Sequence, residues 1–278
     1  MPSSPLLVDL AWRPVAPDLR PFVTAYVERR DVVAFAMMRE LPVPVPLVQI
    51  MLGPDLYFAT DSGPKPVPRA ALWGPSSTAP TSHSGGPLHV LVAVLTLRGA
   101  AVLGRPAEGC LADRQTPLDP ILPSVSRRLL ARVHDAPDCN NRVVAMENWL
   151  REVFRCADPP DAATAMIDAM LDHKLRGPVS RLAQAAGISE RALHKRCERL
   201  IGWPPKKLLR IARLQRVLSA LHPSPWLIHT DPCEALLEHA DDAHLAHDFK
   251  NLTGLTVSAY RKAKLASGDR LVHTLIET

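Results

Sequence analysis

Residues 181–202 read RLAQAAGISERALHKRCERLIG, and the spacing of their apolar side chains predicts two short helices joined by a tight turn. Gly187 lies where the turn is expected, and glycine takes the left-handed backbone conformation that such a turn needs. Ser189 can then cap the second helix, which we expect at residues 190–200. The stretch therefore predicts a helix-turn-helix unit.

The second predicted helix has one apolar face and one basic face. Leu193, Cys197 and Leu200 share the face that we expect to be buried. In such units the N-terminal half of this helix enters the DNA major groove, where Arg and Lys suit guanine O6 and N7 and His can donate or accept a hydrogen bond. The candidates for base contacts are Arg191, His194 and Lys195. The candidates for phosphate contacts are Arg196 and Arg199. Lys206 and Lys207 are further DNA-binding candidates.

The charge changes sign directly after this basic unit. Residues 178–230 hold ten Lys and Arg against two Glu, a net +8, whereas residues 231–254 hold one Lys against six Asp and Glu, a net −5. Neutralisation of phosphates supplies most of the affinity of a protein for DNA. The first unit is therefore expected to carry most of the binding, with His247 and Lys250 as the DNA-binding candidates of the acidic segment.

The order LAQAAGIS, ERALHKRCERLIGWPPKKLL, IARLQRVLSAL and ADDAHLAHDFKNLTGLTVSAYRK resembles the AraC/XylS-type transcription regulators. The match covers nearly all of residues 178–264. The family's tail pattern is kept at His244, Leu245, Phe249, Gly254 and Tyr260. The resemblance implies two helix-turn-helix units joined by a long helix, here at about residues 205–221. It also implies, by position, that Asp242, Ala243 and His247 lie where the second unit would read bases.

The second unit departs from the family pattern at four positions. The small residue, turn glycine, aromatic anchor and proline of the family are replaced by Glu234, Glu238, His239 and Val257. A left-handed turn without glycine costs on the order of 1 kcal/mol, and a carboxylate at a helix crossing needs a partner or water. We therefore expect this unit to fold but to hold DNA poorly.

The N-terminal part is rich in proline and in short apolar runs, which predict strands at residues 22–27, 46–52, 56–59, 70–73 and 89–97. Helical periodicity follows at residues 124–135 and 140–155, then a proline-containing hinge at 156–161 and a helix at 162–174. The stretches LRPFV, LWGPSS and VLTLRGAAVLGRPAE resemble the cupin-like sensing domain of one branch of the family, which serves effector binding or dimerisation. The predicted class is α+β, with a sensing and dimerisation domain at 1–157 and a DNA-binding domain at 158–278.

Composition indicates a globular chain that works in a reducing compartment. The 278 residues are 47% hydrophobic and carry a net charge of +5. The five cysteines are odd in number and form no C-x-x-C pair, which favours free thiols. The N-terminus has no pattern of a signal peptide, and the most apolar run, residues 88–103, is interrupted by Arg98 and too short to cross a bilayer. We expect a cytoplasmic protein with no membrane contact.

The sensing region offers a candidate apolar pocket but no catalytic motif. Its candidate ligand-binding residues are Tyr26, Phe35, Met51, Tyr57, Phe58 and Trp73. Aromatic and methionine side chains also build ordinary cores, which leaves that alternative open. His83, His89 and His134 lack the H-x-H spacing of a cupin metal site, so we expect no metal, no cofactor and no catalytic residue.

These patterns predict a sequence-specific DNA-binding transcription regulator that responds to an effector. Its expected partners are double-stranded DNA, RNA polymerase, a small-molecule effector and a second copy in a homodimer, and activation is the commoner mode in the family. Two alternatives remain. One is an interaction protein or anti-regulator with a degenerate second unit, and the other is a cupin-type metal enzyme.

Overall fold

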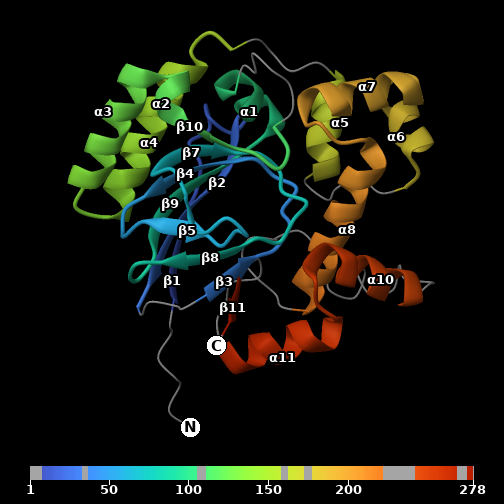
Figure 1. Ribbon diagram of the computed structural model, residues 1–278. Helices are drawn as coiled ribbons and strands as arrows, with labels where there is room; N and C mark the ends of the chain where they lie inside the picture. Colours follow the sequence, from blue (N-terminus) through green and yellow to red (C-terminus); the bar gives the residue numbers. More distant parts are fainter. Residues whose placement is uncertain are drawn as a thin grey trace.

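The chain folds into a β-rich N-terminal region and a helical C-terminal region that lie side by side (Figure 1). The computed structural model describes residues 8–32, 37–104, 111–157, 162–171, 177–221, 242–267 and 274–277. Membership of the α+β class, predicted from the alternation of strand-like and helical patterns, is thereby confirmed.

Two antiparallel sheets form the N-terminal region. The six-stranded sheet runs in the order β1 (Val8–Arg13), β2 (Val23–Asp31), β9 (His89–Leu95), β4 (Leu47–Met51), β7 (Ala70–Trp73) and β10 (Gln115–Pro117). The other sheet runs in the order β11 (Thr274–Glu277), β3 (Met37–Glu40), β8 (Thr81–Ser84), β5 (Leu56–Phe58) and β6 (Lys65–Pro66). Strand β11 comes from the C-terminal end of the chain and pairs with β3, with Ile276 opposite Met38.

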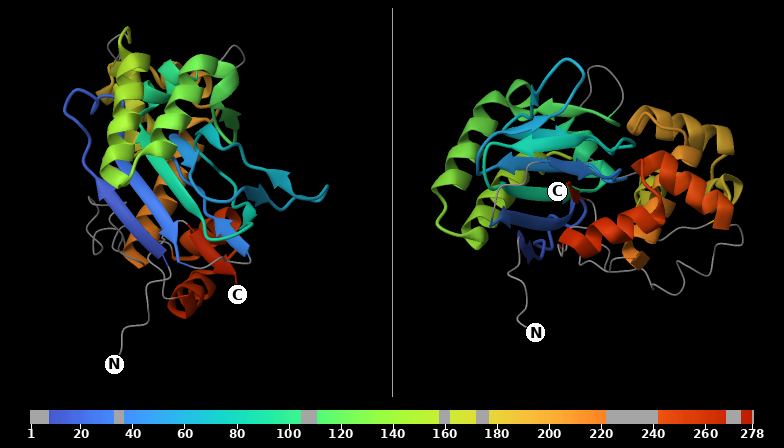
Figure 2. Two further views of the ribbon diagram at one scale, coloured as in Figure 1. Left: turned by 90° about the vertical axis from the view of Figure 1, so that its left-hand side faces the viewer. Right: turned by 60° about the horizontal axis from the view of Figure 1, so that its bottom comes forward.

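The six-stranded sheet is buried on both faces, and side chains of β9 alternate between two cores. Val90, Val92 and Val94 point toward the five-stranded sheet and pack with Met51 and Phe58. Leu91, Ala93 and Leu95 point the other way, toward the helices. These helices are α1 (Leu97–Leu103), α2 (Leu118–Ile121), α3 (Pro123–Asp135) and α4 (Cys139–Phe154), and Figure 2 shows α3 and α4 against one side of the sheet.

The C-terminal region consists of helices packed around a long central one. Its helices are α5 (Ala162–Leu171), α6 (Val179–Ala185), α7 (Glu190–Leu200), α8 (Pro205–Leu221), α10 (Asp242–Thr253) and α11 (Val257–Ser267). Helix α8 joins the two units: its N-terminal half packs with α5 and α7, and its C-terminal half packs with α10 and α11. The predicted long connecting helix at 205–221 is confirmed.

Most of the predicted elements are present. The five predicted strands correspond to β2, β4, β5, β7 and β9, and the predicted helices at 124–135, 140–155 and 162–174 correspond to α3, α4 and α5. The sequence patterns missed β1, β3, β6, β8, β10 and β11, which are short or carry polar residues. Residues 158–161 of the expected hinge lie outside the described residues, and the division of the domains at residue 157 stays a prediction.

Candidate nucleic-acid interface

The first helix-turn-helix unit is built by the local signals that its sequence predicts. Gly187 has a φ of 66°, which is the left-handed conformation expected at the turn after α6. Nothing lies within 4 Å of the Cβ that a larger residue would add there, so the requirement for glycine comes from the backbone and not from crowding. The Ser189 hydroxyl accepts a hydrogen bond from the Ala192 N–H at 3.2 Å and caps α7 as predicted.

One face of α7 is buried in the core of this unit. Leu193 and Cys197 are fully buried and pack with Leu182 and Trp203. Burial raises the pKa of the Cys197 thiol to about 12, so this cysteine stays protonated and fills space. Leu200, predicted to share the buried face, is half-buried against the same core.

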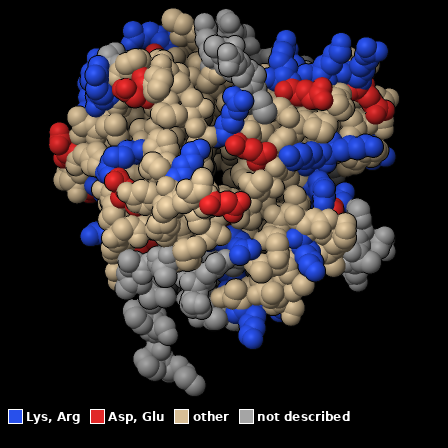
Figure 3. Space-filling view, in the orientation of Figure 1, with Lys and Arg blue, Asp and Glu red and all other residues tan. Residues whose placement is uncertain are grey.

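The opposite face of α7 presents the predicted base-contacting residues to solvent. Arg191, His194 and Lys195 are exposed, and His194 Nδ1 lies 3.3 Å from Glu198 Oε2 one turn later on the helix. Of the predicted phosphate contacts on this helix, Arg199 is exposed and Arg196 is half-buried. Figure 3 shows Lys and Arg side chains gathered over the side of the molecule where α6 and α7 lie.

The two lysines at the start of α8 have different surroundings. Lys206 is exposed, as a phosphate contact requires. Lys207 instead has its Nζ 3.7 Å from Asp113 Oδ2 and 4.8 Å from the centre of the Trp203 ring. Since an ion pair and a ring already engage its ammonium group, Lys207 is better placed to hold the N-terminal region than to reach a phosphate.

Asp113 connects the N-terminal region to the end of the first unit. Its φ of 58° makes it the one non-glycine residue of the described chain with a left-handed backbone. Its carboxylate accepts hydrogen bonds from the Ser77 N–H at 2.6 Å and from Trp203 Nε1 at 3.2 Å. The neighbouring Ala112 N–H donates to the Ile201 carbonyl at 2.8 Å. Sequence patterns could not indicate this contact, because Asp113 and Trp203 lie 90 positions apart.

The second unit is described from α10 onward. His247 and Lys250, the predicted DNA-binding residues of this unit, are exposed on α10. Asp248 is buried and pairs with α8, with its Oδ1 2.8 Å from Arg210 Nε and its Oδ2 4.0 Å from Arg213 Nη1. This carboxylate, counted above among the charges that repel DNA, is therefore neutralised within the protein.

The other acidic positions of the second unit remain a sequence-based expectation. Asp231, Glu234, Glu238, His239 and Asp241 lie outside the described residues, as do the side chains of Asp242, Ala243 and His244. Their effect on DNA binding stays a prediction.

The end of the second unit has regular helix signals despite its departures from the family. Gly254 has a φ of 76° and its N–H donates to the Lys250 carbonyl at 2.8 Å, which ends α10. The Thr256 hydroxyl caps α11 by accepting from the Ala259 N–H. Phe249 and Tyr260 pack edge to face with ring centres 5.8 Å apart. Val257, which replaces the family's proline, begins α11, where proline is optional because the first N–H needs no partner within the helix.

The structure brings three of the six predicted ligand-binding residues together. Met51, Phe58 and Trp73 belong to the core between the two sheets, and the rings of Phe58 and Trp73 lie 5.8 Å apart. Tyr26 lies on the opposite face of the six-stranded sheet, in the core under the helices. Tyr57 alternates with the buried Leu56 and Phe58 and stacks on His83 outside that core. Phe35 lies outside the described residues.

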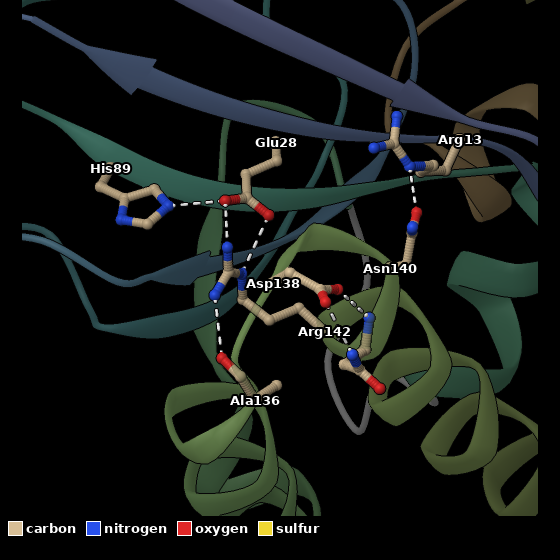
Figure 4. Close-up of polar contacts among 8 residues, drawn as sticks. Arg13, Glu28, His89, Ala136, Asp138, Asn140 and Arg142 are labelled. Atoms are coloured by element: carbon tan, nitrogen blue, oxygen red, sulfur yellow. Dashed lines mark hydrogen bonds and ion pairs between the residues drawn. The ribbon is translucent and has the colours of Figure 1, made fainter.

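A buried glutamate ties α4 to the sheet on the helix-covered face (Figure 4). Glu28 Oε1 lies 2.8 Å from His89 Nε2 and 2.7 Å from Arg142 Nη2. Burial alone would raise the pKa of Glu28, but the hydrogen bonds from His89 and Arg142 outweigh it and bring that pKa to about 2. His89 is thus bonded to a carboxylate that Arg142 also contacts, which is a structural arrangement.

Neither a metal site nor a membrane span is found among the described residues. No group of three or more His, Cys, Asp or Glu side chains comes together there as metal ligands would. Over the same part of the chain, no helix combines the length and the apolar character needed to cross a bilayer.

Comparison with known proteins bears on the C-terminal region. Residues 182–263 match the family described as helix-turn-helix domain. No curated protein sequence matches the chain. Among solved structures, ToxT from Vibrio cholerae in a form bound to an unsaturated fatty acid is similar at a TM-score of 0.45 and 13% identity, over 85% of this chain and 94% of that one. A second ToxT structure from Vibrio cholerae is similar at 0.46 and 12%, over 86% and 98%.

At these scores and identities the structural likeness is loose. The family match at residues 182–263 agrees with the helices, the turn at Gly187 and the cap at Ser189 described above. The C-terminal region of this chain is a helix-turn-helix domain of the AraC type.

Proposed function

We propose that the protein is a transcription regulator that binds double-stranded DNA chiefly through its first helix-turn-helix unit. The observation that carries the proposal is the exposed face of α7, where Arg191, His194 and Lys195 project from a helix whose other face packs into the core. These three would read base edges in the major groove. Arg196, Arg199 and Lys206 would contact phosphates, with Lys207 directed to the sensing region instead.

In this proposal the second unit has an auxiliary role on the DNA. His247 and Lys250 are exposed on α10 and could contact a backbone beside the first half-site. The net charge of −5 over residues 231–254 weakens any such contact, because carboxylates repel phosphates. Pairing of Asp248 with Arg210 removes only one of the six negative charges.

The effector would be a small, largely apolar molecule held between the two sheets. Met51, Phe58 and Trp73 meet there among valine and leucine side chains. Trp73 Nε1 is buried and has no hydrogen-bond partner among the described residues, so it could donate to one polar atom of the effector. The regulator would work in the cytoplasm, pair as a homodimer and act on RNA polymerase, as activators of this family type do.

The test is a binding selection with the full-length chain on a random duplex library, followed by titration of the selected duplex. We expect log affinity to fall linearly with log salt, and Arg191→Ala and Lys195→Ala each to cost about 1 to 3 kcal/mol and to relax base preference. Arg132→Ala, an exposed arginine on α3 of the sensing region, is the matched control and should bind as the parent does.

Two outcomes would argue against the proposal. If the Arg191 and Lys195 variants bind like the Arg132 variant, the α7 face is not the DNA contact. If no duplex is enriched at any salt concentration, the alternative of an interaction protein gains support.

A further inference from the structure

The second helix-turn-helix unit shares its core with the sensing region. Among the described residues, its buried apolar cluster contains Leu214 and Leu218 of α8, Phe249 of α10 and Tyr260 of α11. Leu41, which directly follows strand β3, belongs to the same cluster and is 2% exposed. A leucine from the N-terminal region thus fills part of the interior of the C-terminal unit.

Polar contacts hold the same segment on the second unit. The carbonyl of Pro42, next to Leu41, accepts a hydrogen bond from Gln215 Nε2, and the Gln215 side chain is buried in α8. Arg39 of β3 lies against the turn that ends α10, since a Cβ placed on Gly254 would come within 3.1 Å of Arg39 Nη1. Contacts from Arg39, Leu41 and Pro42 therefore run from β3 and the residues directly after it to α8 and to the α10–α11 turn.

A backbone connection reinforces these contacts. Strand β11, which follows α11 in the chain, pairs antiparallel with β3 over four residue pairs, from Thr274 opposite Glu40 to Glu277 opposite Met37. Figure 2 shows the C-terminus beside the sheets, with α11 next to it. Strand β3 is thus joined to the second unit in two ways, by its pairing with β11 along one edge and by the contacts of Leu41 and Pro42 directly after its last residue.

The same strand reaches the proposed effector site. Met38 of β3 is 1% exposed and belongs to the core between the two sheets, with Met51 and Phe58. Its sulfur lies 3.1 Å from Nη2 of Arg29, whose guanidinium forms a buried pair with Asp31. Because close-packed interiors transmit small displacements, a molecule that moves Met38 would move Leu41 three residues away.

From these contacts we infer that β3 and Leu41 couple the core between the two sheets to the second helix-turn-helix unit. The packing of that unit depends on the N-terminal region. The assignment of an effector to the core between the sheets rests on the proposed function, whereas the dependence of α10 and α11 on Leu41 and β11 does not. The sensing region acts in this scheme as part of the fold of the second unit. Occupancy of the sheet interior then sets how firmly α10 is held on α8.

Hydrogen–deuterium exchange of the full-length chain, without DNA or effector, tests the coupling. Leu41→Ala should accelerate amide exchange in α10 and α11 at least about tenfold while leaving α6 and α7 as protected as in the parent. Leu19→Ala is the matched control: Leu19 is also 2% exposed but lies in the core under α3 and α4. It should accelerate exchange in β2 and α4 without singling out α10 and α11.

A second variant weakens the strand pairing between β11 and β3. In an edge strand alternate N–H groups face the neighbouring strand, so Leu275→Pro combined with Ile276→Pro must delete at least one ladder bond between β11 and β3. Exchange should rise in β3 and α11.

Unchanged exchange in α10 and α11 in both variants would overturn the inference. So would equal acceleration by Leu41→Ala and Leu19→Ala, because that result would mean only general destabilisation. Since the measurement uses no DNA, failure of the coupling is distinguished from failure of the proposed DNA binding.

Discussion

Glu28 illustrates how one residue fixes the packing of a helix on the sheet. The carboxylate is almost fully buried, yet it stays ionised because His89 and Arg142 donate hydrogen bonds to it. Arg142 also donates to the Ala136 carbonyl at 3.0 Å, which places the turn between α3 and α4 (Figure 4). Removal of the carboxylate would leave the largely buried guanidinium without its counter-charge.

Glu28→Gln should therefore lower the free energy of unfolding by on the order of 3 kcal/mol at neutral pH. Hydrogen bonds from His89 and Arg142 lower the pKa of Glu28 to about 2 in the folded chain from an ordinary value of 4.5, so its stabilisation is complete above pH 4.5 and is lost as the pH falls toward 2. The difference between parent and variant should shrink over that interval in urea titrations. Asp55→Asn, which breaks an exposed pair with Arg69, is the control and should change stability little. A parent–variant difference that does not depend on pH would contradict the assignment.

At the scale of elements, α8 and α10 are joined by a charge pair that the family pattern does not predict. Asp248 lies on the inner side of α10 and meets Arg210 and Arg213 of α8. Exposed His247 and Lys250 lie on the outer side of the same helix. Neighbouring charges of α10 thus serve different purposes, one in packing and the others toward solvent.

Asp248→Ala should accordingly lower stability, whereas Asp242→Ala should leave stability nearly unchanged. Asp248→Ala should destabilise the packing of α10 on α8 by about 1 to 3 kcal/mol, because Arg210 loses its partner. Asp242→Ala, at the start of α10, should leave stability nearly unchanged and leave DNA affinity equal or higher, because it removes a charge that repels phosphate. Thermal unfolding and titration of the selected duplex measure the two effects. Loss of operator binding in the Asp242 variant would show that the second unit contributes more than we propose.

Across the whole molecule, the N-terminal region contacts α8 near both of its ends. Near the first end, Asp113 bonds to Trp203 and approaches Lys207, while Ala112 enters the core of the first unit. Near the other end, Leu41 enters the core of the second unit. Two helix-turn-helix units on one helix can bind DNA together only if their relative orientation suits successive major grooves. Because the N-terminal region contacts α8 near both ends, it can control that orientation.

The contact near the first end of α8 depends on the close approach of the Leu111 backbone to Gly74. A Cβ at this position would lie 1.6 Å from the Leu111 carbonyl oxygen, so Gly74→Ala must push residues 111–113 away from the sheet. We expect the free energy of unfolding to fall by about 1 to 3 kcal/mol and the unfolding transitions of the two regions to separate. Tryptophan fluorescence and circular dichroism measure these transitions. Gly85→Ala is the matched control, since its Cβ would meet nothing closer than 4.0 Å. A single unchanged transition in the Gly74 variant would contradict the proposed dependence on Gly74.

The accuracy of the sequence-based predictions depended on the range of the interactions. The helix-turn-helix turn at Gly187, the cap at Ser189 and the exposed face of α7 were all predicted, because each is decided within a few residues. The sequence did not predict which side chains of a strand face the helices and which face the other sheet. Strand β9 is apolar at nearly every position, so its alternation does not say which side chains face the helices and which face the other sheet.

The residues and composition by themselves determined that a basic recognition helix follows a glycine turn and that an acidic segment comes after it. Only the tertiary structure decided that Tyr26 faces the helices, that Lys207 turns to Asp113, and that Leu41 completes a distant core. Caps and turns are local and can be identified in a linear pattern. Contacts between residues 90 or more positions apart depend on the register of strands and the docking of whole regions, and these depend on the packing of the complete chain.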